Sequence, residues 1–163
     1  MRIIKLKDCN EEIYADLAQV DQYASKKYSS SFSDERWGVL HFKHPLPSKF
    51  EMSLVALNSD NKVCGYCIAS LKNGAYPYIH RFVGVNSEQP GITNHLIEAF
   101  TTKYTNIYLL VAKNNPVGVK FYEEHGFSIV SKNDDLEAIL PKLYPNILAP
   151  QTLIQDKYLM KKN

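Results

Sequence analysis

Apolar and polar residues alternate along this chain with two periods, one typical of strands and one typical of helices. A period of two, or a short apolar run, predicts strands at 2–7, 52–58, 62–70, 78–85, 107–112, 127–132 and 156–162. A period of three to four predicts helices at 11–28 and 92–104. The segment 107–112 is almost wholly apolar, as expected of a strand buried on both faces.

Capping residues and prolines mark the ends of the first two helices. Asn10 is the candidate N-cap of the first helix. Ser33 and Asp34 are both candidate caps for a second, short helix that continues through Leu40. The prolines in residues 44–47 end that helix because proline lacks the N–H that a helix interior needs.

A further helix is predicted between Asn115 and Gly126. Asn115 is its candidate N-cap, and Pro116 occupies the first position, where the missing N–H costs nothing. Gly126 is a candidate left-handed C-cap. The inner side of this helix is predicted to carry Val117, Phe121 and Tyr122. The connection 134–151 has room for one more helical segment.

The order of these elements mixes hairpins with crossover helices, which predicts an α/β protein with a mixed central sheet. The length of 163 residues fits a single domain, 1–163, without a linker or an internal repeat. In sheets of this kind, ligands bind where neighbouring strands part and the N-terminus of a helix points at the gap.

Charge and hydropathy narrow the function classes. The net charge is +2, and the Lys and Arg residues are scattered rather than clustered, so the sequence does not favour a nucleic-acid-binding protein. The chain has no apolar stretch of about 18 residues and no signal-peptide core, which predicts a cytoplasmic protein that does not bind a membrane.

The cysteines and two histidines do not indicate a metal or disulfide site. Three cysteines cannot build a disulfide framework. Cys64 and Cys67 lie three apart in a predicted strand, so they are expected on opposite faces, as plain core residues. His41 and His44 lack a third ligand nearby, so we expect no bound metal.

The segment IYLLVAKNNPVGVKFYEEHGFSIV, residues 107–130, resembles the GNAT family of acetyl-coenzyme A-dependent N-acetyltransferases. The matching residues are Asn115, Gly118, the pair Phe121-Tyr122, and Gly126-Phe127. The resemblance implies the GNAT fold: a mixed, mostly antiparallel sheet of about seven strands, about four helices, and strands four and five splayed apart. It also implies acetyl-CoA as the acyl donor, bound in part by Asn115 and Gly118.

In this resemblance Tyr122 is the general acid that protonates the departing thiolate, and it also contacts the cofactor. A phenol with a pKa of about 10 can give a proton to a thiolate whose acid has a pKa of about 8.5 with modest loss of driving force. The residues alone leave a plainer alternative open, in which Asn115 is an N-cap and Tyr122 packs in the core.

A loop before the helix 92–104 supplies the pyrophosphate site that the resemblance implies. Backbone N–H groups and the helix dipole would hold the phosphates there. The residues implied are Gln89, Gly91, Ile92, Thr93 and Asn94. Glu88 and Thr93 depart from the family pattern, which has Gln or Arg and a small residue at these places, and Pro90 removes one N–H donor.

The fourth strand supplies the remaining site residues. The resemblance implies that the backbone of Phe82, Val83, Gly84 and Val85 pairs with the pantetheine arm, with Gly84 allowing close approach. His80 is a candidate catalytic base or relay for the proton of the amine, with packing in the sheet as the alternative. Arg81, one residue on, is expected to face the other side of the sheet. The alternative is that Arg81 faces the acceptor pocket, which would favour an acidic acceptor.

The expected acceptor is a primary amine of a small molecule or a protein, and the protein is expected to be a monomer or a homodimer. Aromatic residues are candidates for the border of the acceptor site: Tyr23, Tyr28, Phe32, Trp37 and Tyr144. Because of Glu88 and Thr93, an alternative function also stands: a catalytically weak or inactive GNAT-like domain that binds acyl-CoA as a sensor or interaction module.

Overall fold

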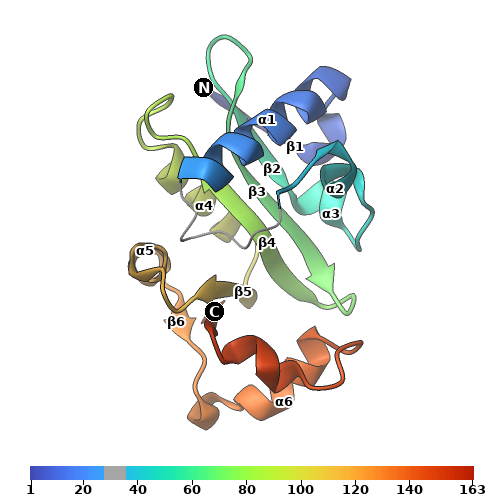
Figure 1. Ribbon diagram of the computed structural model, residues 1–163, viewed down its shortest axis with the longest axis vertical. Helices are drawn as coiled ribbons and strands as arrows, with labels where there is room; N and C mark the ends of the chain where they lie inside the picture. The colour runs from blue at the N-terminus through green and yellow to red at the C-terminus, as the bar shows by residue number, and fades with distance from the viewer. Residues whose placement is uncertain (28–35) are drawn as a thin grey trace.

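The computed structural model describes residues 1–27 and 36–163 and contains one seven-stranded sheet with helices on both faces (Figure 1). The strands are β1 (Arg2–Lys5), β2 (Leu54–Leu57), β3 (Val63–Lys72), β4 (Tyr76–Gly84), β5 (Ile107–Ala112), β6 (Ser128–Ile129) and β7 (Lys157–Lys162). The helices are α1 (Glu11–Lys27), α2 (Val39–Lys43), α3 (Lys49–Met52), α4 (Ile92–Thr101), α5 (Pro116–Glu124) and α6 (Leu136–Leu143).

The strand order is β1-β2-β3-β4-β5-β7-β6. Every neighbouring pair is antiparallel except β4 and β5, which are parallel. The expected mixed, mostly antiparallel sheet is therefore confirmed. The parallel pair follows from the chain between them, because α4 crosses over one face of the sheet and returns the chain in the same direction.

Each face of the sheet has its own core. The front face, defined here as the one that carries Tyr66 and Ile68 of β3, packs against α1 and α2. The back face, which carries Cys67 and Ala69, packs against α4 and α5. In Figure 1 α1 lies in front of the sheet and α4 behind it. A third cluster joins α6 to β4, β5 and β7 through Tyr78, Tyr108 and Leu159, among others.

Several boundaries follow the local signals. Asn10 accepts a hydrogen bond from the backbone N–H of Ile13 at 2.9 Å, so it is the N-cap of α1. Asn115 caps α5, and Gly126 ends it with φ of 88°. Helix α2 ends at Lys43, two residues before Pro45, but it begins only at Val39, later than the predicted caps imply. The candidate caps Ser33 and Asp34 lie outside the described residues.

Other boundaries differ from the prediction. The strand predicted at 52–58 begins only at Leu54, because residues Lys49–Met52 form the short helix α3. The strand predicted at 127–132 is reduced to Ser128–Ile129. The prediction that Val117 lies on the inner side of α5 is wrong, because its side chain is 79% exposed. The connection after β6 contains α6, as expected.

The predicted burial of the two cysteines is confirmed, but the prediction that their side chains point to opposite faces of the sheet is wrong. Cys64 and Cys67 are fully buried, and both pack in the back-face core. A β-bulge between β2 and β3 causes this, because Ala56 pairs with Gly65 and Leu57 with Val63, which leaves Cys64 as the extra residue. The bulge interrupts the alternation that would otherwise send the two thiols to opposite faces.

The start of α4 packs closely against the end of β4. A Cβ atom on Gly84 would collide with the methyl group of Thr93 and would lie 3.2 Å from Cγ2 of Ile92. The branched side chain of Thr93 therefore fills the space that a side chain at position 84 would need. This pair fixes the distance between the strand and the helix N-terminus.

We expect Gly84→Ala to lower the free energy of unfolding by about 1–3 kcal/mol, because the added methyl overpacks this contact. Thr93→Ala in the same chain should restore most of the loss, since it removes the colliding methyl. Chemical denaturation of both single variants and the double variant gives the coupling free energy. Losses that simply add up would contradict the contact described here.

Candidate functional site

Strands β4 and β5 diverge and leave a fork in the sheet. They pair only at Tyr78 with Tyr108 and at Ile79 with Leu109, although β4 continues to Gly84 and β5 to Ala112. Beyond Ile79, no strand of the described residues pairs with β4 on this side. The edge of β4 in the fork can therefore offer backbone N–H and C=O groups to a ligand, as an open sheet edge does.

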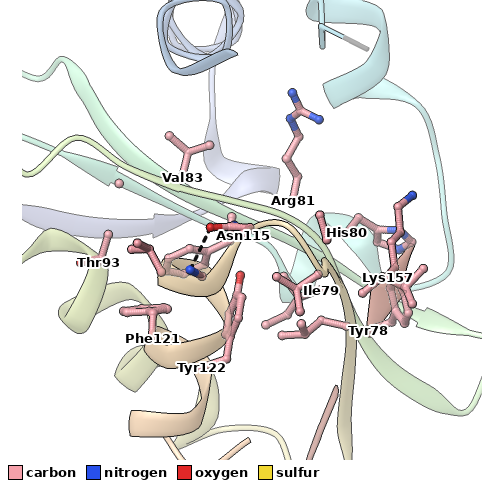
Figure 2. Close-up of a pocket in the computed structure, with 18 of the residues that line it drawn as sticks. Tyr78, Ile79, His80, Arg81, Val83, Thr93, Asn115, Phe121, Tyr122 and Lys157 are labelled. Carbon is pink, nitrogen blue, oxygen red and sulfur yellow. Dashed lines mark hydrogen bonds between the residues drawn. The ribbon is translucent and has the colours of Figure 1, made fainter. Parts of the chain in front are cut away.

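A cavity of about 550 Å³ occupies the fork and reaches both faces of the sheet. Its lining comes from β3, β4, β5, β7, α4 and α5 (Figure 2). The lining residues are Lys72, Tyr78, Ile79, His80, Arg81, Phe82, Val83, Gly84, Asn86, Thr93, Leu109, Leu110, Val111, Ala112, Asn115, Val117, Gly118, Phe121, Tyr122 and Lys157.

A β-bulge at His80 lies at the point where the fork opens. Ile68 pairs with Arg81 and Ala69 pairs with Ile79, so His80 is the extra residue in β4. The bulge places both His80 and Arg81 on the front face, where His80 contacts Ser70 and Arg81 reaches α1. The prediction that Arg81 faces the other side from His80 is wrong, because it assumed unbroken alternation.

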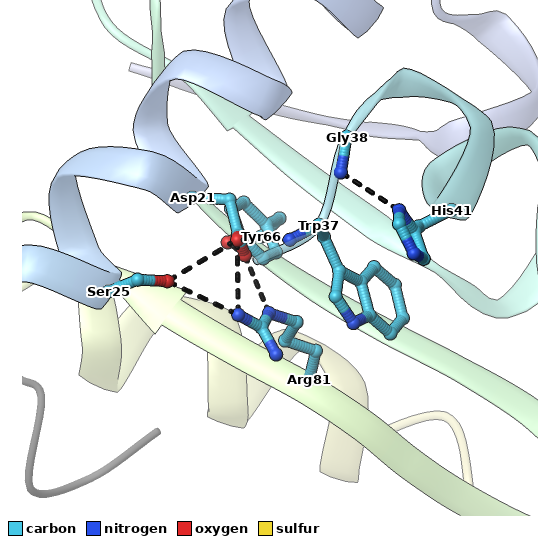
Figure 3. A network of polar contacts seen from close by, with 7 residues as sticks. All are labelled: Asp21, Ser25, Trp37, Gly38, His41, Tyr66 and Arg81. Carbon is cyan, nitrogen blue, oxygen red and sulfur yellow. Dashed lines mark hydrogen bonds and ion pairs between the residues drawn. The ribbon is translucent and has the colours of Figure 1, made fainter. Parts of the chain in front are cut away.

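Arg81 does not offer its charge to the cavity, because it is paired with Asp21 of α1 (Figure 3). The guanidinium donates to both carboxylate oxygens, at 2.5 Å from Nε and 3.0 Å from Nη2. Asp21 is fully buried and also accepts hydrogen bonds from the Tyr66 hydroxyl at 2.6 Å and the Trp37 backbone N–H at 2.8 Å. This network ties α1 and the segment before α2 to the bulge.

Tyr122 presents its hydroxyl to the cavity from α5. Its ring packs against Phe82 of β4, with 6.3 Å between centroids, and against Phe127, with 5.5 Å. The hydroxyl points into the fork (Figure 2) and forms no hydrogen bond with another described residue. Burial of the ring raises the pKa of Tyr122 above its ordinary value, so the phenol keeps its proton at neutral pH.

Asn115 holds the first turn of α5 in place. Its side-chain oxygen accepts a hydrogen bond from the backbone N–H of Gly118 at 3.0 Å. A Cβ atom on Gly118 would collide with this side chain, so the two residues depend on each other. The N-cap alternative for Asn115 is therefore confirmed as its structural role, and its amide group also lines the cavity.

Asn86, which the sequence analysis did not single out, covers the N-terminus of α4. Its side-chain oxygen lies 3.5 Å from the backbone nitrogen of Thr93 and 3.4 Å from the Thr93 hydroxyl. Both residues line the cavity. The preceding Gly91 adopts φ of 79°, a left-handed conformation that suits glycine. An internal side chain thus occupies part of the predicted phosphate site.

His80 is a neutral imidazole in a positively charged environment. Its Nε2 lies 2.6 Å from the Ser70 hydroxyl, and its ring packs at a tilt against the Tyr78 ring, with 4.9 Å between centroids. Burial, together with the charges of Lys72 and Lys49, lowers the pKa of His80 from 6.5 to about 3. A ring with so low a pKa can pass a proton along a hydrogen-bonded path, but it retains a proton poorly.

The cavity brings together most but not all of the predicted site residues. Tyr122, Phe82, Val83, Gly84, Thr93, Asn115, Gly118 and His80 line it. Five predicted cofactor residues do not: Val85, Gln89, Gly91, Ile92 and Asn94. Val85 packs in the front-face core, and Ile92 is fully buried in the back-face core. Gln89, Gly91 and Asn94 belong to the turn and first helical residues around the entrance of α4.

The aromatic residues that were predicted to border the acceptor site lie in different places. Trp37 stacks on the Arg81 guanidinium at 5.2 Å, and Tyr144 exchanges a hydrogen bond with Tyr78 at 2.6 Å between hydroxyl oxygens. Both support residues of the cavity wall rather than line it. Tyr23 is 46% exposed on α1. Tyr28 and Phe32 lie outside the described residues.

Two lysines in the lining, Lys72 of β3 and Lys157 of β7, were missed by the sequence analysis. Lys72 lies two residues beyond the strand predicted at 62–70, and Lys157 lies in the strand predicted at 156–162, so no local pattern distinguished them. Only the pairing of β4 with β3, and of β5 with β7, brings them to one cavity.

The fold is similar over its full length to solved acetyltransferase structures. One is an acetyltransferase of the GNAT family from Staphylococcus aureus Mu50, with a TM-score of 0.69, 13% identity, and coverage of 99% of this chain and 98% of that chain. An acetyltransferase from Streptococcus agalactiae 2603 has the same TM-score, with 16% identity and coverage of 99% and 96%. The PaiA N-acetyltransferase from Thermoplasma acidophilum, solved in complex with coenzyme A, gives 0.65, with 16% identity and coverage of 100% and 99%.

No family model and no curated protein sequence matches the chain. At these identities the structural similarity establishes the fold, and that fold is the one the sequence resemblance implied. None of the helices in the described residues is both long and apolar enough to cross a membrane.

We expect His80 to stay neutral down to about pH 5, because its pKa lies near 3 in the folded protein and near 6.5 in the unfolded chain. Protonation then favours unfolding, so the stability that His80 contributes is present above pH 6.5 and is lost as the pH falls toward 3. Imidazole ¹⁵N shifts measure the protonation state directly. A midpoint between pH 6 and 7 for His80 would contradict the described environment. His80→Gln serves as the assignment control, and its stability should fall less steeply over this pH range.

Proposed function

We propose that this protein, which has the fold of the GNAT acetyltransferases, transfers the acetyl group of acetyl-CoA directly to a primary amine of a small molecule or a protein. The observation that carries the proposal is the Tyr122 hydroxyl, which opens into the fork beside the unpaired edge of β4. An open strand edge suits a ligand with amide groups, and a protonated phenol beside it suits a leaving thiolate.

The residues of the fork fit an extended, amide-containing arm such as pantetheine. Phe82, Val83 and Gly84 lie on β4 beyond its last pair with β5, so their backbone is available on the fork side. Asn115 fixes the turn that begins α5 and lines the opposite wall. The N-terminus of α4 lies at one end of the cavity and provides the favourable end of a helix dipole for phosphate.

In the proposed reaction, the amine nitrogen forms a bond to the carbonyl carbon of the thioester, and the carbon–sulfur bond breaks. Tyr122 donates its proton to the departing sulfur, and the amine gives up a proton to His80 or to a water beside it. Burial raises the pKa of the phenol, but the same low polarity raises that of a thiol, as it does for the nearby Cys67. The proton transfer therefore retains its driving force.

A second candidate function is a catalytically weak domain that binds acyl-CoA as a sensor. The observation in its favour is the Asn86 side chain, which covers the N-terminus of α4 where phosphate would bind. The open Tyr122 hydroxyl favours the enzyme, because a sensor has no need for an unpaired phenol at the fork.

Acetyl-CoA should stabilise the protein against heat. At a concentration about 100 times its dissociation constant, a ligand that binds only the folded state adds about 2.7 kcal/mol. For a chain of this length, that raises Tm by about 5–10 °C. The control is Ala112→Trp, which places a large side chain in the fork and should abolish the shift. An unchanged Tm of the unaltered protein at millimolar acetyl-CoA would rule out both candidate functions.

Tyr122→Phe should lower kcat by about 100-fold or more, because general acid catalysis contributes a factor of this size. The dissociation constant of acetyl-CoA should change little, since the ring and its packing remain. Turnover is measured as release of free thiol, and binding by calorimetry. The matched control is Tyr104→Phe, which alters a tyrosine that packs against Phe100 and does not line the cavity. Equal turnover in Tyr122→Phe and the parent would favour the sensor.

A further inference from the structure

The end of the cavity away from α4 is positively charged. Figure 2 shows Tyr78, His80 and Lys157 at this end and Thr93, at the start of α4, at the other. The donor phosphates belong at the α4 end under the proposed function, so the far end is left for the acceptor. In the described residues that line the cavity there is no Asp or Glu, whereas Lys72 and Lys157 are both present.

Lys72 is a half-buried lysine held in place by aromatic rings. Its Nζ lies 4.9 Å from the centroid of Tyr78 and 4.3 Å from that of Tyr144, as in cation–π contacts. Those two tyrosines are themselves joined by a hydrogen bond between their hydroxyl groups. Burial lowers the pKa of Lys72. The ammonium group is therefore positioned and partly desolvated, which strengthens its attraction to an anion.

Lys157 comes from the opposite side of the fork. It pairs with Ala112 at the end of β5 and shares the sheet face of Leu159, two residues on, in the cluster that contains Tyr78. Within residues 1–27 and 36–163, neither Lys72 nor Lys157 forms an ion pair with a carboxylate. The charge of Arg81, by contrast, is matched by Asp21.

Lys49 adds a third positive charge behind this wall. It is almost fully buried, and its Nζ donates hydrogen bonds to the backbone carbonyls of His41 at 2.8 Å and His44 at 2.7 Å. Carbonyl groups satisfy its hydrogen bonds but do not cancel its charge. The acceptor end of the cavity therefore has a positive potential without a compensating carboxylate.

We propose that the acceptor is an amine that also carries an anionic group, a carboxylate or a phosphate, bound between Lys72 and Lys157. This inference rests on the proposed function and names its substrate class. A simple cationic amine or a polyamine would be repelled from this end, whereas an anionic group on the same molecule offsets the repulsion.

The same lysines would also prepare the amine for attack. Positive charges near an ammonium group lower its pKa, so a larger fraction of the bound acceptor is neutral and nucleophilic. The proton then need not be held by a strong base. This agrees with the environment of His80. Its hydrogen bond to Ser70 and its cationic surroundings suit a group that passes a proton on better than a base that keeps it.

The experiment compares three bisubstrate analogues in which coenzyme A is joined through an acetyl bridge to the nitrogen of tyrosine, tyramine or O-phosphoethanolamine. Tyrosine and tyramine differ only in the carboxylate, and the third compound tests a phosphate. Dissociation constants are measured by calorimetry with the full chain, together with that of coenzyme A alone. Because the coenzyme arm holds the acceptor part in the cavity, even a poor acceptor reports on the lysines.

We expect at least one anionic analogue to bind about 10- to 100-fold more tightly than the tyramine analogue, as for one charged hydrogen bond. Lys72→Met should remove most of this preference and leave the affinity for coenzyme A alone unchanged, and Lys72→Arg should restore it. Lys62→Met, at an exposed position in the β2–β3 turn, is the matched control and should keep the preference. Comparison of the carboxylate and phosphate compounds identifies which anion fits.

Equal affinity for all three analogues, with coenzyme A itself bound, would overturn this inference and leave the proposed function standing. A preference that survives in the Lys72→Met, Lys157→Met double variant would also overturn it. Failure of coenzyme A and of every analogue to bind would overturn the proposed function, and this inference with it.

Discussion

The site depends on a single extra residue in β4. The bulge at His80 breaks the pairing register with β3, turns His80 and Arg81 to the same face, and coincides with the last residues that pair with β5. A bulge increases the local twist and bend of a strand, so the strand on its far side is led away from its neighbour. The fork, its cavity and the open edge of β4 all begin at this point.

The network around Asp21 fixes the position of the bulge and adds little to the free energy of unfolding. A buried ion pair costs about as much desolvation as it returns in attraction, whereas loss of one partner costs about 3–5 kcal/mol. Asp21 accepts hydrogen bonds from Arg81, Tyr66 and the backbone of Trp37, so its carboxylate is satisfied only when α1, β3 and β4 are in register (Figure 3). The pair therefore selects one arrangement of the front face.

The parts of the fold that local chemistry determines could be predicted from the sequence, and those that depend on pairing between distant strands could not. Asn10, Asn115 and Gly126 end helices where their side chains or conformations require it. Register shifts or sheet order explain the shared direction of Cys64 and Cys67, the orientation of Arg81 and the place of Lys72 and Lys157 in one cavity. Motif and strand predicted Tyr122 and His80 near the fork, and both line its cavity.

At the entrance of the cavity, the Asn86 side chain occupies the position at the start of α4 where a phosphate group would bind. Its side chain is tethered seven residues before Thr93, so under the proposed function an incoming phosphate would have to displace it to reach that backbone N–H. Part of the binding free energy of the coenzyme would then be used for this displacement, which would weaken retention of the product coenzyme as much as capture of the donor. For an enzyme of the proposed function, the weaker hold on the coenzyme would allow its faster exchange between turnovers.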